Sequence, residues 1–154
     1  MVDISRIVSV VEIRGVRLRE ASCRSLVRPS ELPEAMNVAT SCDAKAGKVP
    51  PEDGALYIAV NFGLEVHGED AEESLVAEVR GTFELSYQLP EGEVFSAEEL
   101  EAFAGVNAVF NAWPYWRELV QTTLARMSLP VLTVPVFRVP KPDSRDASER
   151  NGDG

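Results

Sequence analysis

The sequence contains few of the side chains that most often carry out chemistry in proteins. Its 154 residues include one histidine, His67, and two cysteines, Cys23 and Cys42. No serine or cysteine lies close to His67 in sequence, and the cysteines form no CxxC pair, so neither a nucleophile–base pair nor a zinc site is indicated. We expect His67 to be an exposed surface residue rather than a general base. We expect both cysteines to be buried, reduced thiols in strands, with a disulfide or a metal site as the alternative.

Motifs for nucleotide binding and hydrolysis are also missing. The sequence has no Gly-rich phosphate loop, no Walker pattern and no GxSxG elbow. The acidic run Glu69-Asp70, continued by Glu72-Glu73, could hold a hard cation, but its spacing matches no EF-hand loop and a solvated turn is expected. We therefore predict a protein that is not an enzyme and needs no cofactor or metal. A small α+β enzyme or ligand-binding domain without a recognisable catalytic motif is the alternative.

Positive charge is scarce. Lysine and arginine number 15 against 25 acidic residues, which gives a net charge of -10. This balance argues against nucleic acid and against anionic membrane surfaces as partners. No apolar run approaches the ~18 residues of a membrane-spanning helix, and the N-terminus lacks the pattern of a signal peptide. We expect a soluble, cytoplasmic protein without membrane insertion.

Hydrophobic residues, in contrast, make up 45% of the chain, and their clearest helical pattern lies between Asn111 and Leu132. Because proline is tolerated only in the first turn of a regular helix, Pro114 predicts a firm helix from about Pro114 to Met127, with a bend or break before it. The apolar stripe of this helix is large enough to be either the centre of the core or a contact with another chain. It comprises Trp113, Trp116, Val120, Leu124 and Met127.

Two alternating segments, residues 56–66 and 75–87, predict a long antiparallel hairpin with one apolar face. Less regular strands are predicted over Val16–Leu26, with a bulge near Arg19, and over Glu34–Asp43. Short helices are predicted over Asp3–Glu12 and over Ala97–Ala104, which follows a Ser96-x-x-Glu99 capping box and precedes Gly105.

Together these elements predict an α+β domain, a four-stranded antiparallel sheet with helices packed on one face. The other face, which carries Glu65, Glu78 and Glu84, should meet water. We place the domain at residues 1–140, including an extended arm over Leu132–Val139, and expect residues 141–154 to form a disordered polar tail. One sheet face can accept only one or two helices, so the apolar surplus suggests a subunit contact or a groove for apolar segments of other chains.

The sequence Trp113-Pro114-Tyr115-Trp116-Arg117-Glu118, followed by Leu129-Pro130-x-Leu132, resembles a signature of the SecB export chaperones. The resemblance covers roughly Val11 to Phe137. It implies a homotetramer built as a dimer of dimers, with the long helices between dimers. It also implies an ATP-independent holdase that binds unfolded polypeptides in apolar grooves, which needs no catalytic residue.

Two departures from the SecB pattern bear on the expected partner. Residues from Arg138 onward are proline-rich and then polar, where SecB export chaperones carry a second amphipathic helix. Of the acidic positions with which that family contacts the translocase motor SecA, Glu20 and Glu78 match, but the third is Arg24. The chain in these respects looks more like the SecB-like chaperones that accompany toxin–antitoxin systems. We expect a dedicated client such as an antitoxin, with protein export as the broader possibility.

Site residues follow from the same resemblance. For client binding we expect Leu26, Val27, Leu32, Met36 and Val38, with Phe137 on the arm as a weaker addition, although each could instead be core. For the core and the packing between dimers we expect Phe110, Trp113, Trp116 and Val120. For a motor-protein contact we expect Glu20 and Glu78.

Overall fold

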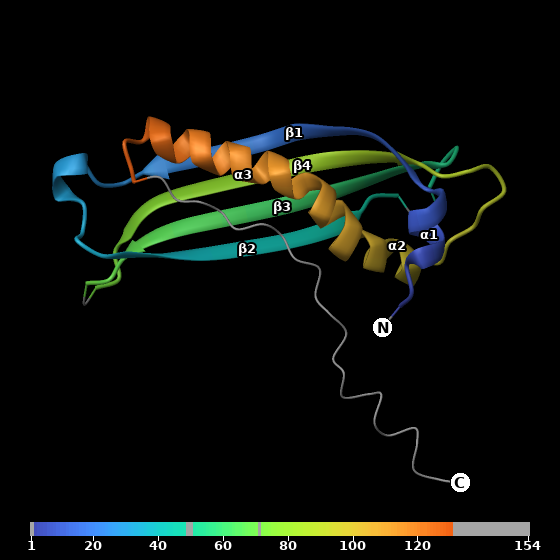
Figure 1. The fold of residues 1–154 in the computed structure, drawn as a ribbon, viewed down its shortest axis with the longest axis horizontal. Coiled ribbons are helices and arrows are strands. Elements are labelled where there is room, and N and C mark those ends of the chain that lie inside the picture. Colours follow the sequence, from blue (N-terminus) through green and yellow to red (C-terminus); the bar gives the residue numbers. More distant parts are fainter. Residues whose placement is uncertain (1, 49–50, 71, 131–154) are drawn as a thin grey trace, which may run out of the picture.

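The fold is a four-stranded antiparallel sheet with helices on one face, as the computed structural model shows (Figure 1). The structure describes residues 2–48, 51–70 and 72–130. The predicted α+β class and the predicted antiparallel hairpin of β3 and β4 are confirmed. Spatial strand order is β1-β4-β3-β2, which places this hairpin at the centre of the sheet. In chain order the elements are α1 (Ser5–Val10), β1 (Glu12–Ser25), the 3-10 turn η1 (Pro29–Glu31), β2 (Met36–Ala46), β3 (Ala55–Gly68), β4 (Leu75–Gln88), α2 (Ala97–Phe103), the π-helical turn η2 (Ala104–Ala108) and α3 (Val109–Arg126).

Strands β3 and β4 form the floor of the core. Their alternation is kept without a break along β3, so every second side chain points toward the helices. A slip of one residue would turn this whole set to the opposite face, which is why the pairing is well defined. The inward set on β3 is Leu56, Ile58, Val60, Phe62, Leu64 and Val66, each at most 7% exposed.

Strand β1 begins at Glu12, four residues before the predicted start at Val16. The pairing of β1 with β4 shifts between Leu18 and Glu20, which confirms the predicted bulge near Arg19, and it shifts again between Ile13 and Gly15. Because each bulge adds one residue to β1, Ala21 and Cys23 return to the helix side after the second shift. Strand β2 runs from Met36 to Ala46 and so extends beyond the predicted end at Asp43.

The long helix differs from the prediction at its start. It was expected to begin near Pro114, but α3 begins at Val109 and contains Pro114, and it continues directly from α2 through η2. Gly105, expected beyond the end of a separate short helix, lies inside η2. Buried Ala104, Ala108 and Ala112 hold these turns against the sheet, so tertiary packing outweighs the local preference of proline for a helix start.

Trp116 is the centre of the packing between α3 and the sheet. It is 1% exposed, and its ring stacks on Phe62 with centroids 5.1 Å apart and planes 9° apart. Gly81 on β4 makes room for it, because a Cβ there would lie 3.4 Å from Trp116 Cζ3 and 2.9 Å from Leu119 Cδ2. Val120 and Leu124 continue the buried stripe toward the end of α3, as predicted.

A side chain caps the start of α2 but not that of α1, whose N-cap residue is Ile4. Ser96 and Glu99 form the predicted capping box, with the Glu99 amide donating to Ser96 Oγ at 3.1 Å and the Ser96 amide donating to Glu99 Oε2 at 2.8 Å. Helix α1 is shorter than predicted, and Asp3 accepts a hydrogen bond from the Ser5 amide at 2.9 Å. The predicted arm over residues 132–139 and the tail over 141–154 lie outside the described residues.

Replacing Trp116 by alanine should lower the free energy of unfolding by about 3–5 kcal/mol, because it removes a buried ring and leaves a cavity over Phe62. Urea denaturation followed by circular dichroism measures the loss. Tyr57→Ala is the control, since Tyr57 is 52% exposed and should lose less than about 1 kcal/mol. Equal losses in the two variants would contradict the central place of Trp116.

Candidate functional site

The helix layer is narrower than the sheet beneath it. Along β3 and β4 the helix-facing side chains are buried, whereas most residues of β1 and β2 are exposed on both faces. Figure 1 shows the reason: the continuous helix α2–η2–α3 crosses the sheet obliquely, with α2 and η2 against β2 and α3 over β3 and β4, so much of each outer strand lies beside it. Apolar side chains on the helix side of β1 and β2 therefore remain open to solvent, which is unusual for the apolar face of a sheet.

Predicted client-binding residues lie at and around one end of the sheet. The connection between β1 and β2 crosses this end, and Leu26 at its start is held by its amide, which donates to the carbonyl of Val76 at 2.9 Å. Leu26 and Val38 are 46% and 39% exposed. Val27, Leu32 and Met36 are partly buried and pack against the core. Phe137 lies outside the described residues.

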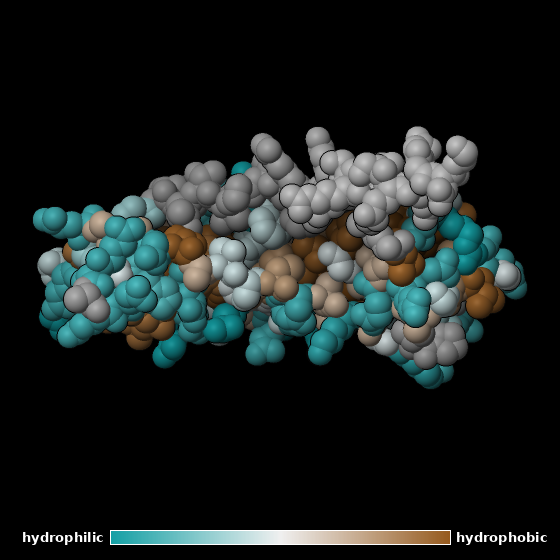
Figure 2. All heavy atoms as spheres, turned by 90° about the horizontal axis from the view of Figure 1, so that it is seen from below, coloured by the Kyte–Doolittle hydropathy of each residue, from teal (hydrophilic) through white to brown (hydrophobic). Residues whose placement is uncertain are grey.

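Three further apolar residues on the helix side were not predicted from the sequence. Ile13 and Leu18 on β1 pair with Tyr87 and Phe83 of β4 and are 46% and 47% exposed. Tyr115 on α3 is 49% exposed. The signal in the sequence was the apolar character of Ile13 and Leu18, but only the strand order shows that β1 is an outer strand. At the opposite edge of the sheet, seen from the β2 side, hydrophobic residues gather along the middle of the molecule (Figure 2).

The residues predicted for the core or the packing between dimers divide into two groups. Trp116 and Val120 are 1% and 0% exposed and lie in the core of the single chain. Trp113 is partly buried, with its ring edge-on to Phe62 at 5.7 Å between centroids. Phe110 is 50% exposed. Of the four, Phe110 therefore presents the most surface for contact with another chain.

The outer face of the sheet carries a network of ion pairs. Glu78 lies between Arg24 and Arg80, with nitrogen–oxygen distances of 3.5 and 3.2 Å, and its side chain is only 16% exposed. Glu84 pairs in the same way with Arg17 at 2.8 Å. Of the two residues predicted for a motor contact, Glu20 is exposed, whereas Glu78 forms an ion pair with Arg24. Arg24 is the residue that stands where the SecB pattern has an acidic one.

The prediction that both cysteines are buried is wrong. Cys23 on β1 and Cys42 on β2 are both free and exposed. They do lie on the apolar side of the sheet, opposite Val79 and Phe62, but on the outer strands that α3 does not cover. Desolvation, followed by the neighbouring charge of Asp43, raises the pKa of the Cys42 thiol to about 11 although the residue as a whole is exposed.

His67 is also placed differently from the expectation of a freely exposed histidine. Its side chain is 26% exposed, and Nε2 lies 3.1 Å from Glu65 Oε2 while Nδ1 lies 3.1 Å from the carbonyl oxygen of Glu73. The hydrogen bond with Glu65 is the main cause that raises the pKa of His67, and the contact with the Glu73 carbonyl is the next. The histidine thus belongs to the ionic network of the outer face.

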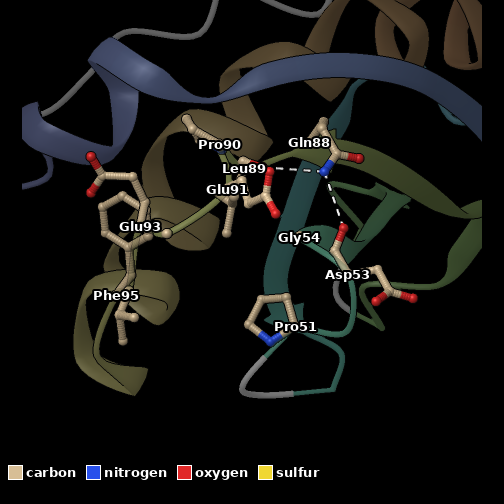
Figure 3. Close-up of a pocket in the computed structure, with 11 residues that line it drawn as sticks. Pro51, Asp53, Gly54, Gln88, Leu89, Pro90, Glu91, Glu93 and Phe95 are labelled. Carbon is tan, nitrogen blue, oxygen red and sulfur yellow. Dashed lines mark hydrogen bonds between the residues drawn. The ribbon is translucent and has the colours of Figure 1, made fainter.

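A hollow of about 610 Å³ lies at the opposite end of the sheet from the predicted client residues. Gln88 crosses its wall and donates through Nε2 to the carbonyls of Asp53 and Leu89, each at 3.2 Å (Figure 3). Its lining is made of prolines, glycines, acidic residues, Gln88, Leu89, Val94 and Phe95, without a histidine or a nucleophilic side chain.

The described part of the chain shows neither a metal cluster nor a membrane-spanning helix. Residues 2–48, 51–70 and 72–130 contain no group of three or more side chains suited to hold a metal ion. None of the helices in the same ranges has the length and apolar character needed to cross a membrane.

Comparison with solved structures relates this geometry to a known fold. The Mycobacterium tuberculosis SecB-like chaperone Rv1957, solved in complex with a ChAD peptide from the HigA1 antitoxin, matches with a TM-score of 0.78 over 89% of this chain and 97% of that one, at 21% identity. A Streptococcus agalactiae protein of unknown function matches with a TM-score of 0.42, at 10% identity over 81% of this chain and 96% of that one. No protein-family model and no curated protein matches the sequence. The fold is that of a SecB-like chaperone.

Cys42 offers a test of the exposed apolar side of β2. Because the thiolate is the reactive form, a pKa of about 11 means that the alkylation rate of Cys42 in a Cys23→Ser variant should rise about tenfold per unit between about pH 8 and pH 10. Iodoacetamide labelling followed by mass spectrometry measures this rate. A rate that levels off near pH 9, as for an ordinary thiol of pKa about 8.5, would contradict the desolvated environment.

Proposed function

We propose that this protein is an ATP-independent chaperone of the SecB-like kind, which binds extended, aggregation-prone segments of other polypeptides. The observation that carries the proposal is the exposed apolar surface on the helix side of the outer strands and at the β1–β2 connection. A segment in contact with these side chains would be held by burial of apolar surface, and a free strand edge could add main-chain hydrogen bonds. Neither interaction requires a fixed client sequence or a catalytic group.

The fold supports this function because the SecB-like chaperone with the same architecture holds a peptide of an antitoxin. In our proposal, Leu26, Val27, Leu32, Met36 and Val38 contact the client, and Phe137 is a further candidate. Exposed Leu26 and Val38 would make the first contact, and the half-buried residues would complete the surface. The enzyme alternative gains no support from the described residues.

A dedicated client such as an antitoxin fits better than general export. A motor protein that recognises acidic positions on the outer face would need accessible carboxylates at Glu20 and Glu78. Glu78 is compensated by Arg24 and Arg80, so it offers little free negative charge. We therefore place SecA second to an antitoxin as a partner, and we propose that the protein acts in the cytoplasm.

Self-association would account for the remaining apolar surface. We propose a homotetramer, a dimer of dimers, in which the α3 helices of different dimers face one another. Phe110 and Tyr115 are the exposed aromatic residues of α3, at 50% and 49%, and would lie in that contact. Aromatic residues of this size are typical anchors of subunit interfaces.

Val38→Glu should weaken client binding about tenfold or more, because it places a charge where an apolar client side chain must be desolvated. The measurement is suppression of aggregation of a chemically unfolded test protein, at near-equal concentration and without ATP. Val94→Glu is the matched control: Val94 is 79% exposed and lies at the other end of the molecule, so activity should persist. If the wild-type protein protects none of several test proteins, general holdase activity is refuted and only a dedicated client remains.

Tyr115→Arg should shift the protein from tetramer toward dimer, because four introduced charges would meet in the contact between α3 helices. Analytical ultracentrifugation over a range of concentrations measures the change. Val94→Arg introduces the same charge at a residue that is at least as exposed but distant from α3, so it should leave the sedimentation coefficient unchanged. An unchanged tetramer in Tyr115→Arg would mean that α3 does not form the contact.

A further inference from the structure

His67 joins strand β3 to the turn that follows it. It is the next-to-last residue of β3, and its ring lies between a carboxylate on its own strand and a backbone carbonyl of the turn. Glu73, which supplies that carbonyl, has a φ of +44°, a conformation that non-glycine residues rarely adopt. The turn thus holds a strained residue in a position where its carbonyl oxygen faces Nδ1 of His67.

Both partners of the His67 ring can only accept hydrogen bonds. A backbone carbonyl has no proton to give, and an ionised carboxylate has none either. Neutral imidazole carries one N–H and therefore satisfies one such partner, whereas imidazolium carries two and satisfies both. Glu65 Oε2 and the Glu73 carbonyl each lie 3.1 Å from a ring nitrogen, so both contacts are hydrogen bonds when the ring is protonated and only one is when it is neutral.

The turn held by His67 also supports the connection that carries the predicted client residues. The Glu69 amide donates to the carbonyl of Ala35 at 2.9 Å. Gly68 lies against Pro33, since a Cβ at Gly68 would be 2.8 Å from Pro33 Cγ. Gly68 also pairs with Met36 at the start of β2. A change in the turn is therefore transmitted to backbone next to Leu32 and Met36.

We propose that His67 is a proton-operated clamp: the imidazolium holds the β3–β4 turn closed, and loss of its proton loosens the turn and the adjoining β1–β2 connection. The direction follows from linkage. A histidine whose pKa is raised in the folded state stabilises the closed turn at low pH, and this contribution is lost as the pH rises through that raised pKa. The effect on client binding rests on the proposed function, but the clamp does not.

The charged neighbours of the His67 ring come from β3, from β4 and from the turn. The carboxylates of Glu65 and Glu73 favour the protonated ring, and desolvation opposes it. On β4, Arg80 reaches Glu65 Oε1 at 3.6 Å and Glu78 at 3.2 Å, so it shares rather than removes the negative charge beside the ring. Asn37, opposite His67 on β2, is uncharged. In the turn, the Asp70 carboxylate is engaged by the amide and hydroxyl of Ser74.

Proton NMR can follow this clamp without assignment, because the chain contains one histidine. The ring resonance of His67 should titrate with a midpoint above the ordinary value of about 6.5. Glu65→Gln removes the main cause of the shift and should lower the midpoint. Glu84→Gln removes an outer-face carboxylate that pairs with Arg17 instead, and should leave the midpoint where it was. A wild-type midpoint at or below about 6.5 would overturn the clamp.

Amide exchange tests whether the turn responds. After correction for intrinsic rates, protection of the Glu69 and Gly68 amides should fall at least about threefold as the pH rises through the midpoint. His67→Gln cannot titrate, so its protection should stay low and independent of pH. Wild-type protection that does not change with pH would show that the charge on His67 does not hold the turn.

Client affinity is measured separately with a fluorescent, extended apolar peptide bound by the wild-type protein at about pH 6. The wild type should bind several-fold less tightly at about pH 8.5, and His67→Gln should bind equally at both. If peptide affinity does not change with pH while amide exchange in the turn does, the link between the turn and the client surface is refuted. Absence of binding at every pH would refute the proposed function, while the clamp would still be decided by NMR and exchange.

Discussion

The packing of α3 on the two central strands of a four-stranded sheet, with only α2 and η2 reaching β2, is the constraint on which this structure depends. The contact of Trp116 with Phe62 and Gly81 fixes α3 over β3 and β4. One helix is about 10 Å across and strands are spaced about 4.8 Å apart, so α3 can cover only about two of them. The outer strands are covered only in part: Val16 and Ala44 pack against the core, whereas Leu18 and Val38 remain 47% and 39% exposed in the single chain. The apolar surface available to partners is thus a geometric consequence of the architecture.

The two faces of the sheet differ in how their exposed side chains are stabilised. On the outer face the side chains of neighbouring strands satisfy one another: Arg17 pairs with Glu84, and Arg24 with Glu78, across the β1–β4 ladder. Each exposed pair adds little to stability, but together they leave few charges without a partner on that face. Apolar side chains on the helix side of the outer strands cannot pair with one another in this way, because they are stabilised only when other atoms cover them and exclude water. Association is therefore expected on the helix side.

Much of the fold could be predicted from the sequence because it depends on local patterns. The strict alternation from Leu56 to Val66 specified a strand with one buried face, and Ser96 with Glu99 specified a helix start. The position of β1 and β2 could not be predicted, since strand order depends on contacts distant in sequence. For this reason Cys23 and Cys42 were expected to be buried like other strand residues on an apolar face. The prediction that α3 begins near Pro114 was wrong for a related reason. Packing of Ala112 and its neighbours on the sheet extends α3 toward the N-terminus, beyond the start that proline favours.

The candidate site was less predictable than the fold, and the reason lies in the interaction itself. An enzyme needs particular groups at particular distances, so its motifs can be recognised in one sequence. A surface that binds apolar segments needs only exposed apolar area of about the right shape. Other aliphatic residues in place of Leu26 and Val38 could provide that area equally well. The fold matches a SecB-like chaperone over 89% of the chain at only 21% identity. Such divergence is expected where the packing between helix and sheet must be kept but exposed aliphatic side chains can be exchanged for others of similar size.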